Sequence, residues 1–218
     1  IEVDDHQVNQ ANLVVLGREN GRYTISDPVM ENLESLSYDE LMRVRWARGL
    51  FQPKGKMYYP VKIPGEIDLA TAIVKGIRKN CREMIRVPIP FLGVRGIRYL
   101  ARDIRGWPAK LGDKKAALHL GQFIRMQEEI GTGGAGFRFI YAAFLQEASK
   151  ILNRPRLQEL SRDMTDCGDR WREFAVMAAR IIKNRSGEGE SYNAMSAILL
   201  EIADREQAIF KELRKAVS

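Results

Sequence analysis

The stretch from Glu128 to Ala148 reads EEIGTGGAGFRFIYAAFLQEA, and its glycines decide how the chain is understood. Four glycines and one threonine occur within residues 131–136, and apolar residues with helical spacing follow at once. Such a segment is either a phosphate-binding loop of a nucleotide enzyme or a connection between two packed helices.

The nucleotide interpretations lack the sequence context that they need. A Walker loop carries a Lys and then a Ser or Thr after its last glycine, where this chain has Phe137 and Arg138. A dinucleotide fingerprint follows a strand, whereas the residues before Gly131 have a helical pattern. The sequence therefore favours a helix–loop–helix connection.

Within that connection, a packing role is one interpretation. Gly131 suits the position just after a helix, where φ is positive, and Thr132 suits a capping position. Gly133, Gly134 and Gly136 allow the next helix to approach another element closely. In this interpretation the glycines are a hinge.

A substrate-binding role is the other interpretation, and both stay open. Backbone N–H groups at the start of a helix can bind a ligand oxygen or an acyl group. A positive charge and a hydroxyl follow, one helical turn apart. The candidate substrate-binding residues are Gly131, Thr132, Gly133, Gly134, Arg138 and Tyr141.

Working outward, the chain from Glu66 onward has a helical pattern, with apolar residues at Ile67, Ala70, Ile73 and Ile77. Pro108 and Gly112 separate two of the helices. The predicted helices cover residues 66–85, 92–107, 113–130, 137–152, 156–184 and 191–216.

The first sixty residues are rich in β-type patterns. Strands are predicted over 11–17 and 23–28, joined at the Asn20-Gly21 turn signal into a hairpin. Ser37, with Glu40 three residues later, forms a capping box for a helix that runs to Arg48.

A third strand is predicted over residues 56–64, at a sheet edge because of Pro60. We therefore expect an α+β protein with a short antiparallel β piece in residues 1–63 and an α-helical bundle domain in residues 64–218. The incomplete sheet edge makes self-pairing, and so a homo-oligomer, one expectation.

The composition is that of an ordinary globular protein, with 45% hydrophobic and 29% charged residues among 218. Thirty-five Lys and Arg against 28 Asp and Glu favour acidic partners, but the charges are interleaved, so we expect no nucleic acid and no membrane partner. Two cysteines without a signal peptide or an apolar span predict reduced thiols and a cytoplasmic protein.

Three segments carry a resemblance to a known family: GTGGAGFRFIYAAFLQEA, LGVRGIRYLARDI and DCGDRWREFA. They resemble the helical C-terminal domain of proteins similar to the butirosin-biosynthesis H protein, a domain of unknown function. The resemblance runs from about Glu66 to the C-terminus, and the Gly-Asp-x-Trp element at Trp171 supports it.

In that family a papain-like half, similar to bacteriocin-processing cysteine peptidases, precedes the helical domain. The resemblance implies that residues 1–63 are the end of that half. It implies a catalytic His at the start of one strand and an Asp in an Asp-Pro step at the end of the next. Asp27 fits the second requirement; His6 is the candidate for the first, although the family pattern places the His near Ala11 and Asn12.

The resemblance implies a cysteine-dependent acyltransferase-like protein that moves an acyl group, with an acyl carrier protein as a candidate donor, to an amine. The nucleophilic Cys is expected before Ile1. A non-catalytic helical binding or dimerisation module, and a cysteine peptidase acting on an acyl or peptide substrate, are the alternatives.

The remaining thiols and imidazole are expected to be structural. Cys81 and Cys167 fall in helices and are interpreted as small core residues, although basic neighbours of Cys81 can lower a thiol pKa. His119, among apolar neighbours, is expected in the core or at an interface. No cofactor and no metal are expected, because no His, Cys and carboxylate set has metal-ligand spacing.

Overall fold

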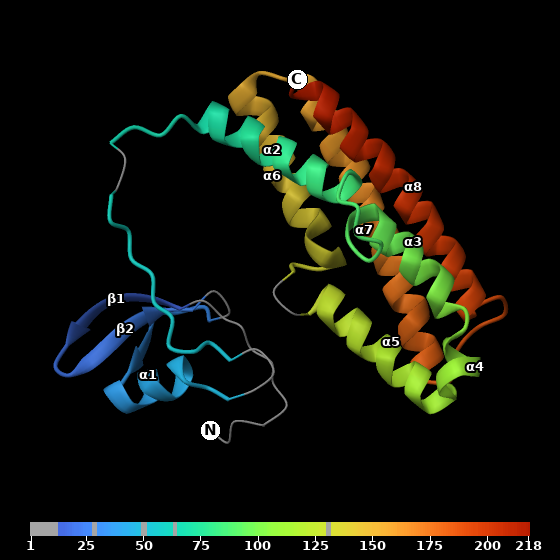
Figure 1. Cartoon of the computed structure of the whole chain (residues 1–218), viewed down its shortest axis with the longest axis horizontal. Coiled ribbons are helices and arrows are strands. Elements are labelled where there is room, and N and C mark those ends of the chain that lie inside the picture. The colour runs from blue at the N-terminus through green and yellow to red at the C-terminus, as the bar shows by residue number, and fades with distance from the viewer. Residues whose placement is uncertain (1–12, 28–29, 49–51, 63–64, 130–131) are drawn as a thin grey trace. The chain divides into compact units, whose positions relative to one another are not determined.

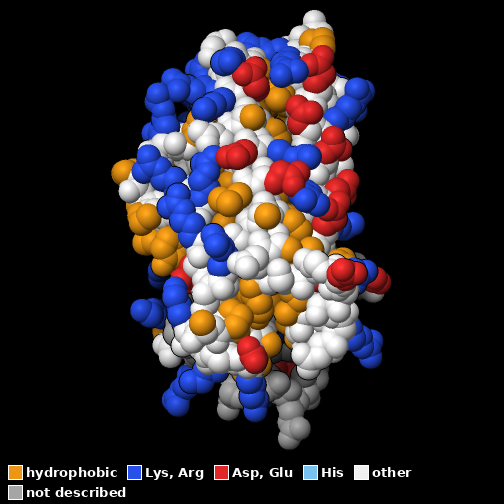
Figure 2. All heavy atoms as spheres, turned by 90° about the vertical axis from the view of Figure 1, so that its right-hand side faces the viewer, with side chains coloured by type: hydrophobic (Ala, Val, Ile, Leu, Met, Phe, Trp, Pro, Cys, Tyr) orange, Lys and Arg blue, Asp and Glu red, His pale blue; other side chains and the backbone are white. Residues whose placement is uncertain are grey.

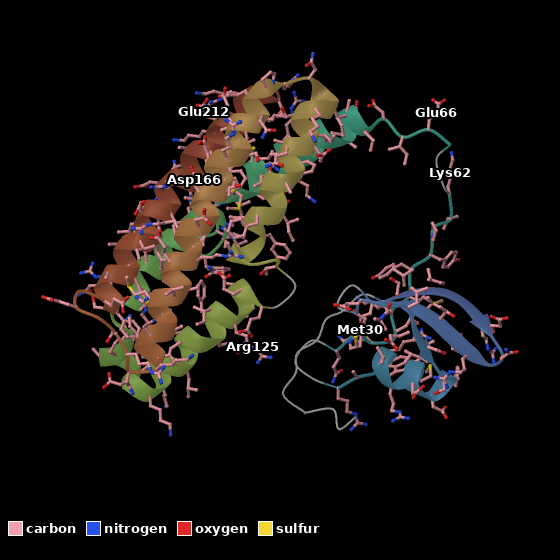
Figure 3. The ribbon with its side chains drawn as sticks, turned by 180° about the vertical axis from the view of Figure 1, so that it is seen from behind. Met30, Lys62, Glu66, Arg125, Asp166 and Glu212 are labelled. Carbon is pink, nitrogen blue, oxygen red and sulfur yellow. The ribbon has the colours of Figure 1, made fainter. Side chains whose placement is uncertain are left out.

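The computed structural model describes residues 13–27, 30–48, 52–62, 65–129 and 132–218. The chain is a mixed α+β protein that divides into two compact units, Ile1–Gly65 and Glu66–Ser218 (Figure 1). The segment between Lys62 and Glu66 joins them (Figure 3). No helix in the described part of the chain is long and apolar enough to cross a bilayer.

The first unit contains an antiparallel sheet of strand order β1-β2-β3, formed by β1 (Val14–Glu19), β2 (Arg22–Ser26) and β3 (Glu34–Leu36). Asn20 and Gly21 connect β1 to β2 with φ of 50° and 80°. Two positive φ angles in a two-residue turn match the twist of the flanking strands, which is why Asn-Gly is favoured there. The structure confirms the predicted hairpin.

Helix α1 (Tyr38–Arg45) begins where its capping box predicts. The Ser37 hydroxyl accepts from the Glu40 N–H at 3.3 Å, and the Glu40 carboxylate accepts from the Ser37 N–H at 2.7 Å. These two bonds satisfy donors that the first turn of a helix leaves free.

The predicted third strand at residues 56–64 is wrong over 56–62, which are irregular in the structure. Pro60 cannot donate to a sheet ladder, and the side chains of Tyr58, Tyr59 and Val61 are 84%, 74% and 90% exposed. With no face to bury, this apolar run gains nothing from pairing. The third strand is the short β3, which pairs with β2 just before α1.

The second unit is helical throughout its regular elements. Its elements are α2 (Leu69–Ile85), α3 (Gly93–Ile104), α4 (Trp107–Leu111), α5 (Asp113–Glu128), the short 3-10 turn η1 (Ala135–Phe137), α6 (Arg138–Leu152), α7 (Pro155–Ile182) and α8 (Tyr192–Ala216).

The two long helices α7 and α8 pack against each other, with α6 along α7 and with α2 and α3 along α8 (Figure 1). Helix α5 packs against α7. Phe174, Leu145 and Leu199 are fully buried between these helices. Each such side chain contributes about 1.5–3 kcal/mol on burial, so this core is the main stabilising element of the unit.

The sequence did not predict α4, because Pro108 was interpreted as a break between two helices. Pro108 instead occupies the first turn of α4, where its missing N–H has no intrahelical partner to lose. Gly112, with φ of 77°, then ends α4 and precedes α5. A proline in its first turn and a glycine at its end thus allow α4 to form where a break was expected.

Candidate functional site

Asp27 lies at the end of the hairpin where β1 begins. The last pair of the ladder joins Val14 to Ser26, so Asp27 follows directly and would stand opposite Leu13 in the same register. The Asp27 carbonyl accepts from the Met30 N–H at 3.1 Å. His6, the second candidate catalytic residue, lies outside the described residues.

The glycine segment has an unusual backbone. Five successive residues have positive φ: 65° at Gly133, 85° at Gly134, 49° at Ala135, 54° at Gly136 and 71° at Phe137. Glycine adopts this region freely, but Ala and Phe there cost about 1–3 kcal/mol each. The surrounding structure must therefore hold the segment in place.

Polar groups of the protein provide that support. The Ala135 N–H donates to both carboxylate oxygens of Glu128, at 3.2 Å each. The Thr132 hydroxyl donates to the Gln127 carbonyl at 2.5 Å and accepts from the Gly134 N–H at 3.3 Å. These backbone donors already have protein acceptors, which supports the packing interpretation. Gly131 lies outside the described residues.

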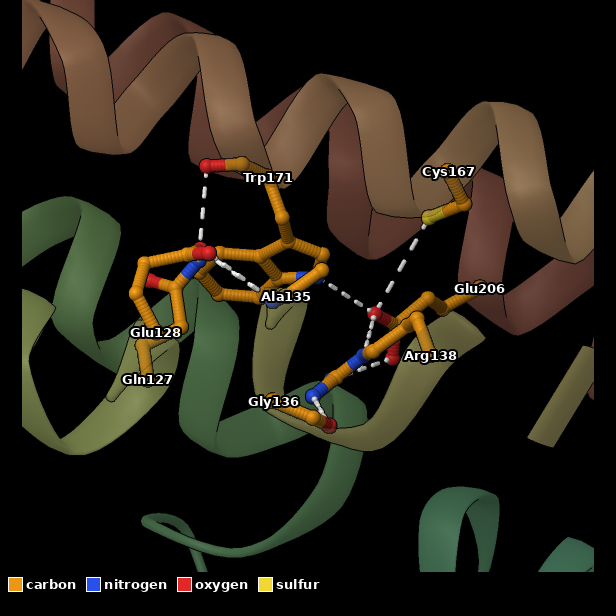
Figure 4. A network of polar contacts seen from close by, with 8 residues as sticks. All are labelled: Gln127, Glu128, Ala135, Gly136, Arg138, Cys167, Trp171 and Glu206. Carbon is orange, nitrogen blue, oxygen red and sulfur yellow. Dashed lines mark hydrogen bonds and ion pairs between the residues drawn. The ribbon is translucent and has the colours of Figure 1, made fainter. Parts of the chain in front are cut away.

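Arg138, Trp171 and Glu206 form a buried polar network beneath the segment (Figure 4). The fully buried Glu206 carboxylate accepts from Arg138 Nε at 2.8 Å, Arg138 Nη2 at 3.0 Å and the Trp171 indole at 2.8 Å. Arg138 also donates to the Gly136 carbonyl at 2.7 Å and lies 5.0 Å from the centre of the Trp171 ring. The network thus ties the glycine segment to α7 and α8.

Glu206 was not among the residues expected from the sequence, although its position on the apolar face of α8 can be recognised there. Leu199, Ile202, Ile209 and Leu213 lie on the apolar face of α8 and are buried, and Glu206 falls at the intervening position of the same 3-4 spacing. A carboxylate on an apolar stripe needs a cation or several donors. Arg138, 68 residues earlier, is that cation.

Tyr141 has a buried rather than an open hydroxyl. Its ring centre lies 5.7 Å from that of Phe144 and 5.9 Å from that of Phe210. Burial raises the pKa of the Tyr141 hydroxyl further above its ordinary value near 10. The Tyr141 ring therefore packs against its aromatic neighbours, and a role of Tyr141 in substrate binding stays a prediction.

Both thiols are buried. Burial raises the pKa of Cys81 to about 11 and, together with the charge of Glu206, raises the pKa of Cys167 to about 12. The basic neighbours of Cys81 do not offset this effect. Because the thiolate is the reactive form, neither cysteine suits nucleophilic catalysis.

His119 is exposed, so it does not lie in the core, and its expected place at an interface stays a prediction. Its Nδ1 atom lies 2.8 Å from the Lys115 carbonyl, and its ring meets Trp107 edge to face at 6.1 Å. Of its apolar neighbours in the sequence, Ala116 and Leu120 are buried, whereas Leu118 is exposed like His119. Among the described residues, no group of three or more His, Cys, Asp or Glu side chains is arranged to hold a metal ion.

Comparison with known proteins gives a family but no activity. No curated protein matches the chain. The sequence model of the family described as "Domain of unknown function (DUF4872)" matches residues 39–213, which include α1 and nearly all of the helical unit. The chain therefore belongs to the DUF4872 family.

Proposed function

We propose that the chain is part of a cysteine-dependent acyltransferase-like protein, which moves an acyl group through a thioester to an amine. The proposed donor is an acyl carrier protein. The proposal joins the resemblance to the butirosin-biosynthesis H-like family with the geometry of the hairpin and the state of the two thiols.

The observation that carries the proposal is the end of the β1–β2 hairpin. A papain-like centre needs an imidazole near the start of one strand and a carboxylate at the end of its antiparallel neighbour. Asp27 follows the last β1–β2 pair, Val14 with Ser26, at the end where β1 begins. A carboxylate there could fix the tautomer of an imidazole from the chain that precedes β1, for which His6, eight residues before Val14 in the sequence, is the candidate.

The reaction would proceed in two balanced steps. A cysteine thiolate attacks the carbonyl carbon of the donor thioester and forms a new S–C bond. The C–S bond of the donor breaks, and the donor thiol leaves with a proton from the imidazolium. The amine then attacks the enzyme thioester, loses a proton to the imidazole, and releases the cysteine. His6 is the proposed base and Asp27 its orienting carboxylate.

The proposal needs a nucleophile other than Cys81 and Cys167, because both thiols are buried and have raised pKa values. The small hydrophobic core of the first unit supports its proposed place in a larger β domain: among the described residues of this unit, only the hydrophobic side chains of Ile25 and Leu41 are buried. Val14 and Leu16 of β1 are 56% and 57% exposed, as in a sheet that lacks its covering layer.

The helical unit would then serve binding rather than chemistry. Its described part combines two inert thiols with an exposed imidazole that has no carboxylate or thiol partner in hydrogen-bond range. Its glycine segment is held by internal hydrogen bonds, which gives a rigid surface. Such a unit suits the positioning of a donor or an acceptor.

Thiol alkylation of the intact protein tests the proposal. Iodoacetamide at pH 7, read by peptide mass spectrometry, should label one cysteine rapidly while Cys81 and Cys167 stay unlabelled. Asp27→Asn and His6→Ala should each slow that labelling at least tenfold. Asp39→Asn, on the exposed first turn of α1, is the matched control and should leave the rate unchanged.

Rates that are the same in Asp27→Asn, His6→Ala and the control would overturn the two assignments. Absence of any fast cysteine would favour the non-catalytic binding module. Transfer and hydrolysis are separated by adding an amine acceptor to the acylated protein. The acyl group ends on the amine in a transferase and on water in a peptidase.

A further inference from the structure

Helices α2 and α8 border an open groove of about 630 Å³ that is lined by cations. The lining includes Cys81 and Ser218 together with six exposed basic side chains. We call it the α2–α8 basic groove; its basic residues are Lys75, Arg78, Lys79, Arg82, Arg86 and Arg214.

The charges of the groove are largely uncompensated. Lys79 forms an ion pair with Glu83 at 3.9 Å, and Arg78 donates twice to the Val217 carbonyl, at 2.7 and 3.2 Å. Among the described residues, Arg82, Arg86 and Arg214 have no Asp or Glu side chain within 4 Å, and no Asp or Glu lines the groove. Close like charges repel, so an anion is the favourable occupant.

The basic residues of the groove extend along α2. Its α2 residues, from Lys75 to Arg86, recur at helical spacing and lie along one face over three turns, which is about 16 Å at 1.5 Å per residue. A single phosphate group would contact only one turn of this row. Carboxylates spaced at i, i+3, i+4, i+7 and i+11 on a partner helix would face the whole row.

The neighbouring surface argues against a broad polyanion. The adjoining depression on α8 shares Arg214 and Ser218 with the groove but also includes Asp204 and Glu212. On the face in Figure 2, Lys and Arg side chains predominate on the left, whereas Asp and Glu side chains alternate with Lys and Arg on the right. A nucleic acid or a membrane that covered both surfaces would meet these carboxylates, whereas an acidic helix would cover only the basic strip.

We propose that the α2–α8 basic groove docks an acidic helix of a partner protein. The inference is independent of the acyl-transfer proposal, because it uses only the charges and shape of the helical unit.

The test uses the full chain and two labelled helical peptides. The first carries glutamates along one face at i, i+3, i+4, i+7 and i+11; the second has the same composition with the glutamates spread around the helix. Fluorescence anisotropy at 50 and 150 mM salt should give tighter binding, by at least fivefold, for the first peptide.

Arg82→Glu/Arg86→Glu should weaken that binding at least tenfold. Arg95→Glu/Arg102→Glu is the matched control, because both arginines of α3 are exposed, form no ion pair within 4 Å with any residue that the structure describes, and give the same change of net charge. The control should change binding less than threefold. Arg82→Gln/Arg86→Gln, together with melting curves, excludes misfolding as the cause.

Equal binding of the two peptides, equal losses in the two double variants, or no saturable binding below 1 mM peptide would each overturn the proposal. Single-stranded DNA and phosphatidylserine vesicles are measured in parallel. Tighter binding of either one, lost in Arg82→Glu/Arg86→Glu, would assign the groove to a polyanion instead of a helix.

Discussion

Replacing Glu206 by Gln should destabilise the helical unit strongly, because it removes a buried charge from beneath Arg138. The Glu206 side chain is fully buried, whereas that of Arg138 is 20% exposed. Removing one partner of a buried ion pair costs about 3–5 kcal/mol. Arg138 keeps some water and the Gly136 carbonyl, so we expect the lower end, about 3 kcal/mol.

Urea unfolding followed by circular dichroism measures this loss directly. In thermal unfolding it corresponds to a melting temperature lower by about 6–12 °C for a chain of this size. Glu201→Gln is the matched control on the same helix: Glu201 accepts from Arg170 at 2.7 and 2.9 Å, but its side chain is 37% exposed. The control should lose less than about 1 kcal/mol.

Losses that agree within about 0.5 kcal/mol for the two variants would refute the reasoning, since a buried and an exposed pair would then contribute equally. A double variant, Arg138→Met/Glu206→Met, adds a second check. Replacing both charges by apolar groups removes the uncompensated cation, so it should be more stable than Glu206→Gln alone.

The other predictions concern single positions. Gly168→Ala should cost about 1–3 kcal/mol, because its Cβ would lie 2.8 Å from the Phe139 ring, whereas Gly76→Ala in open space should stabilise slightly; urea titrations compare them. Burial raises the pKa of Cys81 from 9.0 to about 11. The stability that its neutral thiol contributes is therefore complete below pH 9 and lost as the pH rises toward 11. Unfolding measured at pH 8.5 and 10.5 should show that loss of stability, and the loss should be smaller in Cys81→Ala. Ser37→Ala should lower the stability of the first unit by about 1 kcal/mol, measured by hydrogen exchange in α1; protection equal to that of the parent protein would contradict this.

The parts of the fold set by local chemistry could be predicted from the sequence. The turn at Asn20 and Gly21 and the capping box of Ser37 depend on neighbouring residues, and both occur as expected. The strand expected at 56–64 depended on whether its apolar side chains would find a face to cover. Tyr58 and Val61 did not, which sequence alone does not reveal.

The candidate site was less predictable, because its central contacts join distant segments. Arg138 was selected for its place beside the glycines, but its partner Glu206 lies 68 residues away. A positive φ was expected only at Gly131, and the other glycines were expected to allow a close approach of helices. The run of positive φ angles that includes Ala135 and Phe137 was not foreseen. That strain is held by Glu128 on α5, a tertiary contact.

The acyl-enzyme itself provides the most direct test of the proposed function. The intact protein is incubated with an acyl-loaded carrier protein and without an amine, then analysed by intact-mass and peptide mass spectrometry. The account predicts one hydroxylamine-sensitive acyl adduct, on a cysteine other than Cys81 and Cys167. An adduct on either of these two buried cysteines, or acyl transfer to an amine without any thioester adduct, would contradict it.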